Sequence, residues 1–246
     1  MISAGIDIGS RTVKLVVLED GQIILSRRRE NSFDPLAVCR ELLEGVRYDR
    51  LIATGYGRYL AKQHLNCEVI TEIKAFALGA RASFPHCRTI LDIGGQDIKA
   101  ISLDGNGGVR KFEMNDKCSA GTGRFLEIMA MVLGAQMSEF GNLALKAGRA
   151  EKINSTCTVF AESEIISMLS RRAMPEEIAM GIHQSVASKA KSMLGRVAVE
   201  DEVVFVGGVA LNPCVVKMIN ESIGKTVHVP HDPQNVGAYG CAIWDK

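Results

Sequence analysis

The chain lacks a long apolar stretch and an excess of charge of either sign. Its longest apolar run, Val203 to Val216, is interrupted by two glycines, an asparagine and a proline. That run falls short of the roughly 20 residues that a membrane-spanning helix needs. With 29 basic and 28 acidic residues, the net charge of +1 argues against a dedicated nucleic-acid surface. We therefore expect no membrane segment and no nucleic-acid partner.

The chain also lacks the features of an exported or disulfide-bonded protein. Asp7 and Arg11 interrupt the apolar core that a signal peptide would need. The seven cysteines are an odd number without any CxxC spacing, which gives little support to a disulfide framework or a four-cysteine zinc site. We expect a cytoplasmic protein, with one large domain or two small ones in 246 residues.

One segment of the chain recurs further along it. Ile6 to Lys14 reads IDIGSRTVK, and Leu91 to Lys99 reads LDIGGQDIK, so that Asp, Ile, Gly and Lys recur in register. Asp7 and Asp92 thus lie 85 residues apart (92 minus 7). Each copy reads as a strand, a tight glycine turn, a second strand, another turn and a third strand. Two such meanders, each followed by helices, predict two related α/β lobes that face one another.

The periodicity of the apolar residues predicts the elements of both copies. Strands are expected near 2–8, 12–19, 22–29, 50–54, 88–93, 97–103, 109–114 and 202–206. Helices are expected near 34–45, 56–65, 72–83, 122–134, 138–147, 160–171, 175–198, 212–223 and 235–244. No Pro- or Ser-rich linker separates the copies, so we expect the lobes to join compactly near residues 84–88.

The two glycine turns suit a phosphate-binding role. Backbone N–H groups in such a turn can approach phosphate oxygens without a Cβ in the way. Asp7 and Asp92 each stand at a strand end just before the turn, where two carboxylates could hold hydrated magnesium. A third element, the apolar strand that ends in Gly207 and Gly208, suits the base or ribose of a nucleotide.

These three segments resemble the phosphate-1, phosphate-2 and adenosine motifs of the actin, Hsp70 and sugar-kinase ATPase superfamily. Val236 to Ala242 is similar to the late connecting helix of that superfamily. The resemblance implies an α/β, two-lobed actin-like ATPase with ribonuclease H-like duplicated lobes and the nucleotide in the cleft between them. It implies a first lobe over residues 1–86, completed by a C-terminal helix in 232–246, and a second lobe over residues 87–231.

Carried over position by position, the resemblance gives roles to residues of all three segments. Asp7 and Asp92 would hold magnesium-bound water. Gln96 would orient the attacking water, with Asp97 as the competing candidate. The phosphate-binding positions would be Gly9, Ser10, Arg11, Thr12, Gly94, Gly95 and Gln96, and the adenosine contacts Gly207 and Gly208.

Two cysteines stand beside predicted helix starts. Cys118 precedes the helix expected from residue 122, and Cys157 precedes the helix expected from residue 160. Helix N-termini expose unpaired N–H groups and a positive dipole end, which stabilise a thiolate and any anion that it holds. We interpret the remaining cysteines as small buried apolar residues: Cys39, Cys67, Cys87, Cys214 and Cys241.

The number of candidate thiolates predicts a quaternary structure. An iron–sulfur cubane takes four thiolates, and Cys118 and Cys157 supply two. A homodimer that shares one cluster across its two-fold axis would complete the set.

The segments CSAGTGRFL from Cys118 and CTVFAESE from Cys157 are similar to the two cluster segments of one family. It comprises the reductive activators (component A) of 2-hydroxyacyl-CoA dehydratases, in the BadF/BadG/BcrA/BcrD ATPase group. TGYGR at 54–58 fits the same pattern. The resemblance implies a homodimer with one bridging [4Fe-4S] cluster bound by Cys118 and Cys157. It also implies hydrolysis of ATP with Mg²⁺, and one-electron transfer from ferredoxin or flavodoxin to a dehydratase-type partner.

Three other functions share parts of the pattern. The ATPase components of benzoyl-CoA reductases carry the same motifs. A small-molecule kinase of the superfamily could use Asp97 as its base, although 246 residues leave little insertion to build a substrate pocket. An actin-like filament is the third alternative, and no feature of the chain requires polymerisation.

Overall fold

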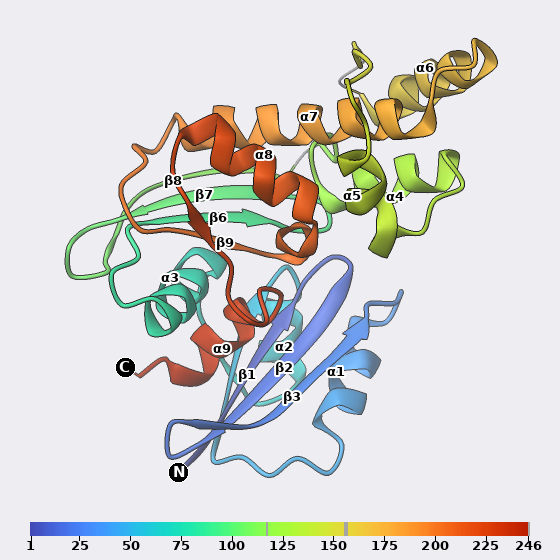
Figure 1. Ribbon diagram of the computed structural model, residues 1–246. Coiled ribbons are helices and arrows are strands. Elements are labelled where there is room, and N and C mark those ends of the chain that lie inside the picture. The colour runs from blue at the N-terminus through green and yellow to red at the C-terminus, as the bar shows by residue number, and fades with distance from the viewer. Residues whose placement is uncertain (117, 155–156, 246) are drawn as a thin grey trace.

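Two five-stranded sheets, with helices between and around them, make up the molecule (Figure 1). The computed structural model describes residues 1–116, 118–154 and 157–245. Residue 246, the end of the predicted segment 232–246, therefore lies outside the described residues. Both chain ends lie beside the first sheet. The expected α/β fold with two related lobes is confirmed.

The first repeat forms the first sheet. Its strands are β1 (Ile2–Ile8), β2 (Thr12–Glu19), β3 (Gln22–Glu30), β4 (Arg50–Gly55) and β5 (Glu68–Val69). They follow the order β3-β2-β1-β4-β5, with the first three antiparallel and the last two added in parallel. Helices α1 (Pro35–Leu43) and α2 (Arg58–His64) cover one face, where Ile6, Leu15 and Leu42 are buried.

The second repeat forms the second sheet with the same topology. Its strands are β6 (Thr89–Ile93), β7 (Ile98–Leu103), β8 (Val109–Asn115), β9 (Val203–Val206) and β10 (Val227–His228). Their order, β8-β7-β6-β9-β10, matches the first sheet strand for strand, and so do the parallel and antiparallel pairings. The repeat seen in two short motifs therefore extends over two whole sheets.

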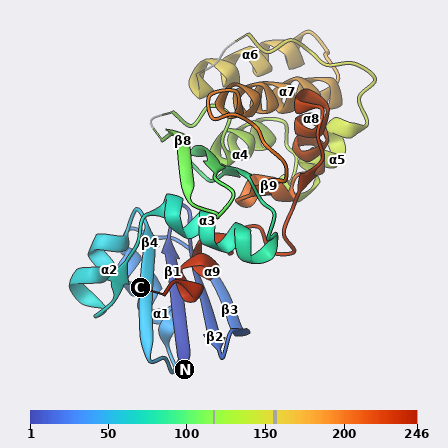
Figure 2. The same ribbon diagram turned by 90° about the vertical axis from the view of Figure 1, so that its left-hand side faces the viewer.

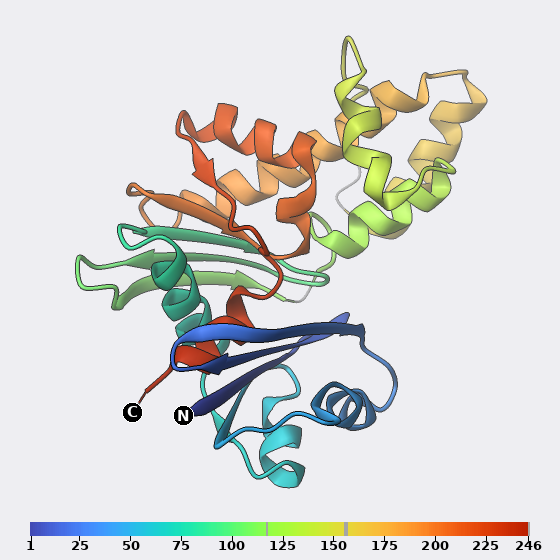
Figure 3. The same cartoon turned by 60° about the horizontal axis from the view of Figure 1, so that its bottom comes forward.

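The copies differ in what connects the third and fourth strands. In the first copy this connection holds α1, whereas in the second it holds α4 (Gly123–Val132), α5 (Met137–Leu145), α6 (Thr158–Ser170) and α7 (Pro175–Leu194). The added helices extend beyond one end of the second sheet (Figure 3). The long helix α7 and α8 (Pro213–Ile223) cover the outer face of that sheet, over a single large core cluster.

Helices α3 (Glu72–Ser83) and α9 (Val236–Ile243) lie between the two sheets (Figure 2). Each ends one repeat but packs on the sheet of the other: Phe76 of α3 joins the core of the second sheet, and Ala238 of α9 packs on the first. Their backbones touch, because a Cβ on Gly79 would lie 2.1 Å from the Val236 carbonyl oxygen. A Cβ on Gly240 would lie 1.8 Å from the Ala75 oxygen.

The predicted elements are found with small shifts at their ends, and three short elements were missed. β5, β10 and the 3₁₀ turn Gly208–Leu211 span two, two and four residues, too few for a periodic pattern to reveal. The long helix ends at Leu194 rather than at residue 198. The exchange of α3 and α9 makes each lobe depend on the other, and the lobe limits at residues 86 and 231 stay a prediction.

No single helix in the described part of the chain is long and apolar enough to cross a membrane. One bent pair, α4 and α5, meets that test by length and composition with an angle of 79° at the break. Phe125 of α4 and Phe140 of α5 are buried in the core cluster of the second sheet.

We expect Gly240→Ala to destabilise the protein by about 1–3 kcal/mol, because the new methyl group must push α3 away from α9. Gly105→Ala is the matched control, since a Cβ there meets nothing within 4 Å. Urea midpoints of the two variants test the difference. Equal urea midpoints would mean that α3 and α9 can move apart without loss of stability.

Candidate functional site

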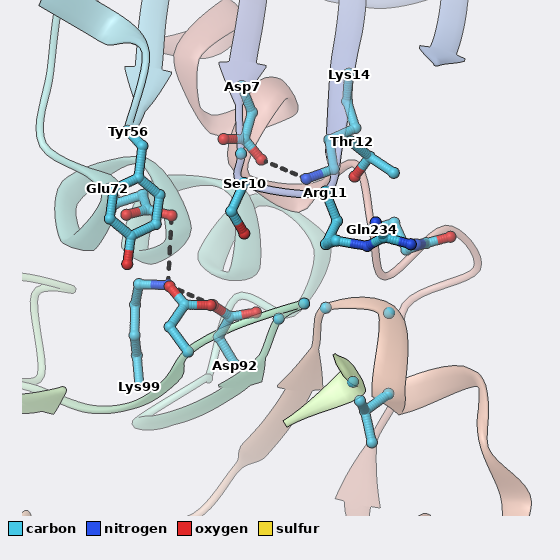
Figure 4. A pocket seen from close by; sticks show the side chains of 18 of the residues that line it. Asp7, Ser10, Arg11, Thr12, Lys14, Tyr56, Glu72, Asp92, Lys99 and Gln234 are labelled. Carbon is cyan, nitrogen blue, oxygen red and sulfur yellow. Dashed lines mark hydrogen bonds and ion pairs between the residues drawn. The ribbon is translucent and has the colours of Figure 1, made fainter. Parts of the chain in front are cut away.

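A cleft of about 220 Å³ separates the ends of the two sheets. It opens between the first turn of each repeat, so residues far apart in sequence face each other across it (Figure 4). Residues from both sheets and from α3 and α4 line it: Asp7, Gly9, Ser10, Arg11, Thr12, Lys14, Tyr56, Glu72, Phe76, Asp92, Gly94, Gly95, Asp97, Lys99, Gly123, Glu127, Met137, Gly207, Gly208, Val209 and Gln234.

The repeat places the same ion pair on both sides of the cleft. Asp7 of β1 is the cross-strand partner of Lys14, and Asp92 of β6 is the partner of Lys99. The Lys14 ammonium lies 3.0 Å from Asp7 Oδ2, and the Lys99 ammonium 2.9 Å from Asp92 Oδ2. Asp7 Oδ1 is buried and has no hydrogen-bond partner among the described residues. A magnesium-bound water would supply the missing donor.

Lys99 holds a second layer of carboxylates. Its ammonium also contacts Asp97 Oδ2, and it lies 3.3 Å from Glu72 Oε1. Lys99 is 1% exposed, and burial alone would lower its pKa. The attraction of the three carboxylates outweighs burial and raises the pKa of Lys99 well above its ordinary value, so the ammonium stays charged.

Burial raises the pKa values of Asp92 and Glu72, and the positive charge of Lys99 offsets only part of this rise. The pKa of Asp92 rises to about 6, through burial first and then Asp97, while Lys99 opposes the shift. The pKa of Glu72, the first residue of α3, rises to about 7 for the same leading reason. A carboxyl group with a pKa near neutral can accept a proton inside this cleft.

Two glycines make room for the paired aspartates. Gly55 ends β4, Gly207 follows β9, and both have φ +86°, a left-handed conformation that side chains rarely adopt. A Cβ on Gly55 would lie 2.7 Å from Asp7 Oδ1, and one on Gly207 would lie 2.5 Å from Asp92 Oδ1. Gly55 is therefore the first-copy counterpart of the glycine predicted to contact adenosine.

The structure brings ten of the predicted nucleotide-site residues to the cleft and leaves one outside its lining. The ten are Asp7, Gly9, Ser10, Arg11, Thr12, Asp92, Gly94, Gly95, Gly207 and Gly208. Gln96 is exposed and does not line the cleft, whereas its competitor Asp97 does. The roles of all these residues stay predictions, and no role in the site was predicted for Lys14, Lys99 or Glu72. The two lysines carried a signal, because they recur with the aspartates in the repeat.

The two candidate cluster cysteines line one hollow on the side of the added helices. Cys118 and Cys157 are exposed, and both border a cavity of about 680 Å³ against α7. The residues that follow them touch: Ser119 Oγ lies 3.0 Å from Thr158 Oγ1. The five other cysteines are buried, as predicted. In the described part of the chain, no group of three or more His, Cys, Asp and Glu side chains is arranged to hold a metal.

Both predicted helix starts are found within two residues of their expected positions, but only Cys157 is itself at a helix N-terminus. Cys157 is the N-cap of α6. Cys118 lies five residues before Gly123, the first residue of α4, whose N-cap is Thr122. The Ser119–Thr122 turn separates the two, because Thr122 N–H and Oγ1 donate to the Ser119 carbonyl oxygen at 3.0 and 2.6 Å.

The raised pKa of Glu72 predicts a pH dependence of stability. The folded protein binds this proton more tightly than the unfolded chain, so the group's stabilising contribution is complete below its ordinary pKa of 4.5 and is lost as pH rises through about 7. Glu72→Gln removes this loss, so its stability relative to the parent should improve as pH rises. Urea unfolding across that window tests this, with the exposed Glu41→Gln as control. If the stability of Glu72→Gln relative to the parent instead falls as pH rises, the predicted direction of the pH dependence is wrong.

Comparison with known proteins shows the family of the chain. The sequence model of the BadF/BadG/BcrA/BcrD ATPase family matches residues 4–244. The chain is 42% identical to the activator of lactoyl-CoA dehydratase from Anaerotignum propionicum, over 99% of this chain and 97% of that protein. It is 34% identical to one of the subunits of benzoyl-CoA reductase from Thauera aromatica, over 99% of this chain and 92% of that protein.

A solved structure shows the same fold. The activator of the 2-hydroxyisocaproyl-CoA dehydratase from Clostridium difficile, with bound ADPNP, matches with a TM-score of 0.90 and 41% identity. The match covers 98% of this chain and 93% of that one. The cleft with its duplicated aspartates and the family match thus lead to one conclusion: the chain belongs to the BadF/BadG/BcrA/BcrD ATPase family.

Proposed function

We propose that the protein is an ATP-dependent activator that delivers single electrons to a 2-hydroxyacyl-CoA dehydratase-type enzyme. The observation that carries the proposal is the presence, in one chain, of a duplicated Asp–Lys phosphate cleft and of two exposed cysteines that border one hollow. The protein would take one electron from reduced ferredoxin or flavodoxin and pass it to the dehydratase. ATP hydrolysis would supply the free energy.

The residues of the cleft fit ATP with magnesium. The turns Gly9–Thr12 and Gly94–Gln96 offer backbone N–H groups to the phosphates, and Lys14 adds positive charge. Asp7, with its unpartnered Oδ1, would hold the magnesium waters together with Asp92.

Glu72 is our candidate for orienting the attacking water. It lines the cleft, its pKa lies near neutral, and Lys99 fixes its Oε1. Gln96, predicted for this role, would have to move into the cleft. Asp97 also lines the cleft, and Lys99 holds its Oδ2 as it holds Glu72 Oε1, so Asp97 stays the competing candidate.

The cysteine hollow fits one half of a [4Fe-4S] site. Cys118 and Cys157 would bind the cluster together with the same residues of a second copy, because a cubane takes four thiolates. When bound, the cluster would supply the centre that holds the transferred electron. Val159 and Phe160, the residues that follow in α6, are each 68% exposed and would be covered by that second copy.

Two further points of the proposal follow from the cysteines and the relatives. The seven cysteines are free, which favours the reducing cytoplasm. Alternatively, the protein would be the ATPase subunit of a benzoyl-CoA reductase-type complex. A small-molecule kinase would instead be colourless and would phosphorylate an added hydroxylated acceptor.

Replacing Asp7 should abolish ATP hydrolysis while leaving the iron in place, because the cleft and the cysteine hollow are separate. Phosphate release by Asp7→Ala tests this, with the exposed Asp20→Ala as control.

Glu72→Gln should slow hydrolysis by about 10²–10⁴-fold, the usual contribution of a general base. If Gln96→Ala loses as much and Glu72→Gln loses little, the water-orienting role belongs to Gln96. Unchanged turnover in Asp7→Ala would refute the magnesium role.

Anaerobically purified protein should be brown and dimeric, with about four irons per dimer. Cys118→Ala and Cys157→Ala should each lose the iron and its absorbance, whereas Cys39→Ala, at a buried cysteine, should keep both. Iron and sulfide analysis with sedimentation velocity measures all three properties. A Cys118→Ala protein that still holds the full cluster would exclude this ligand.

A further inference from the structure

Helix α4, which follows Cys118 in the chain, begins directly on the second phosphate turn, Gly94–Gln96. Gly123 N–H donates to the Gly94 carbonyl oxygen at 2.9 Å, and Arg124 N–H donates to the Gly95 oxygen at 2.8 Å. Thr122 Oγ1, whose proton goes to the nearer Ser119 oxygen, lies 3.1 Å from the same Gly95 oxygen. Any shift of this turn must therefore shift the start of α4.

An arginine from the first phosphate turn reaches across the cleft to this helix. The stem of Arg11 lies over Gly95, where a Cβ would come within 2.4 Å of Arg11 Cγ. Its guanidinium then lies 3.2 Å from Glu127, one turn into α4, and both residues line the nucleotide cleft. Arg11 is thus held to α4 at the site where a polyphosphate would lie.

Glu127 does not depend on Arg11 alone. Arg124 Nη1 lies 3.1 Å from the same Glu127 oxygen, so the carboxylate keeps a partner if Arg11 leaves. The Arg11–Glu127 pair is also partly exposed, with side chains 42% and 32% accessible, and such pairs are weak. A phosphate chain carries more charge than one carboxylate and accepts a bidentate guanidinium equally well.

From α4 the contacts continue to both cysteines. The buried Thr122 bonds to the Ser119 carbonyl oxygen, which fixes the turn between α4 and Cys118. Ser119 in turn bonds to Thr158, next to Cys157. One short chain of contacts therefore leads from Arg11 to the hollow that Cys118 and Cys157 share.

We propose that Arg11 is the positioning residue that couples nucleotide binding to the cysteine segments, by exchanging Glu127 for the phosphates of ATP. Without nucleotide, Arg11 ties the first repeat to α4 through Glu127. With ATP bound, the guanidinium turns to the phosphates, and α4 and the Ser119–Thr122 turn are freed to move with the second phosphate turn. The proposal rests on the function proposed above and names the residues that perform its coupling.

Affinity for a non-hydrolysable ATP analogue, measured by calorimetry on the full chain, separates this exchange from a structural role. Glu127→Gln removes the competitor for Arg11, so the analogue should bind roughly two- to fivefold tighter, the range of a surface ion pair. Arg11→Gln should bind it more weakly. A purely structural role for the pair would weaken binding in both variants. Glu113→Gln is the matched control, since Glu113 pairs with Arg196 outside the cleft and its side chain is also 32% exposed.

Thiol alkylation measures the coupling itself. In the cluster-free full chain only Cys118 and Cys157 of the seven cysteines are exposed, so their alkylation rates, resolved by peptide mass analysis, report on the hollow. The analogue should change these rates in the parent and in Glu113→Gln. In Arg11→Gln and Glu127→Gln the rates without nucleotide should already match the nucleotide-bound parent. A full nucleotide response in Arg11→Gln, or no tightening in Glu127→Gln, overturns the proposal.

These outcomes are distinguishable from a failure of the proposed function. If the purified protein holds no iron but the thiols respond to the analogue through Arg11, the coupling stands and the electron-transfer function fails. If the iron is present and Arg11→Gln responds like the parent, the coupling fails and the function stands.

Discussion

The approach of α3 and α9 to backbone contact is the constraint on which the cleft depends. Gly79 and Gly240 allow the two helices to cross without intervening side chains, and Gly5 lets α9 lie directly on β1, where a Cβ would come within 2.0 Å of the Ala238 carbonyl oxygen. Because each helix packs on the sheet of the other repeat, the crossing fixes how far apart the sheet ends stand. Larger residues at these positions would separate the two turns that we propose to bind one phosphate chain.

The longer connection between β8 and β9 contains both candidate cluster cysteines. The first copy closes this connection with α1 alone, and the second replaces it with α4 to α7 and the loops that contain both cysteines. Since α4 starts on the second phosphate turn, the added helices did not need a separate mechanical link to the nucleotide. The link is the turn itself, through the bonds of Gly123 and Arg124.

The sequence was informative where a pattern recurred and silent where only tertiary packing decides. The recurrence of Asp7 as Asp92, 85 residues later (92 minus 7), predicted two related lobes that face one another, and the superfamily resemblance implied the nucleotide cleft between them. Glu72 could not be predicted, because nothing in an ordinary acidic helix start shows that the helix will lie beside Lys99 of the other repeat. The start of α4 was predicted to within one residue, but the sequence could not show that the Ser119–Thr122 turn separates Cys118 from it, because polar runs suit helix caps and turns equally.

The two halves of the site share a plan but differ in charge. The first half holds one carboxylate, Asp7, on Lys14, and the second gathers Asp92, Asp97 and Glu72 around Lys99. Four carboxylates face two ammonium groups, so full ionisation would leave two negative charges uncompensated in a partly buried cleft. Burial, and then the repulsion among these carboxylates, raises the pKa values of Asp92 and Glu72, so bound protons relieve part of this excess. A magnesium ion would supply the two positive charges, and Asp7 Oδ1 has no hydrogen-bond donor among the described residues that would compete with a magnesium-bound water. The asymmetry thus favours the metal on the Asp7 side and the proton acceptor on the Lys99 side of one duplicated site.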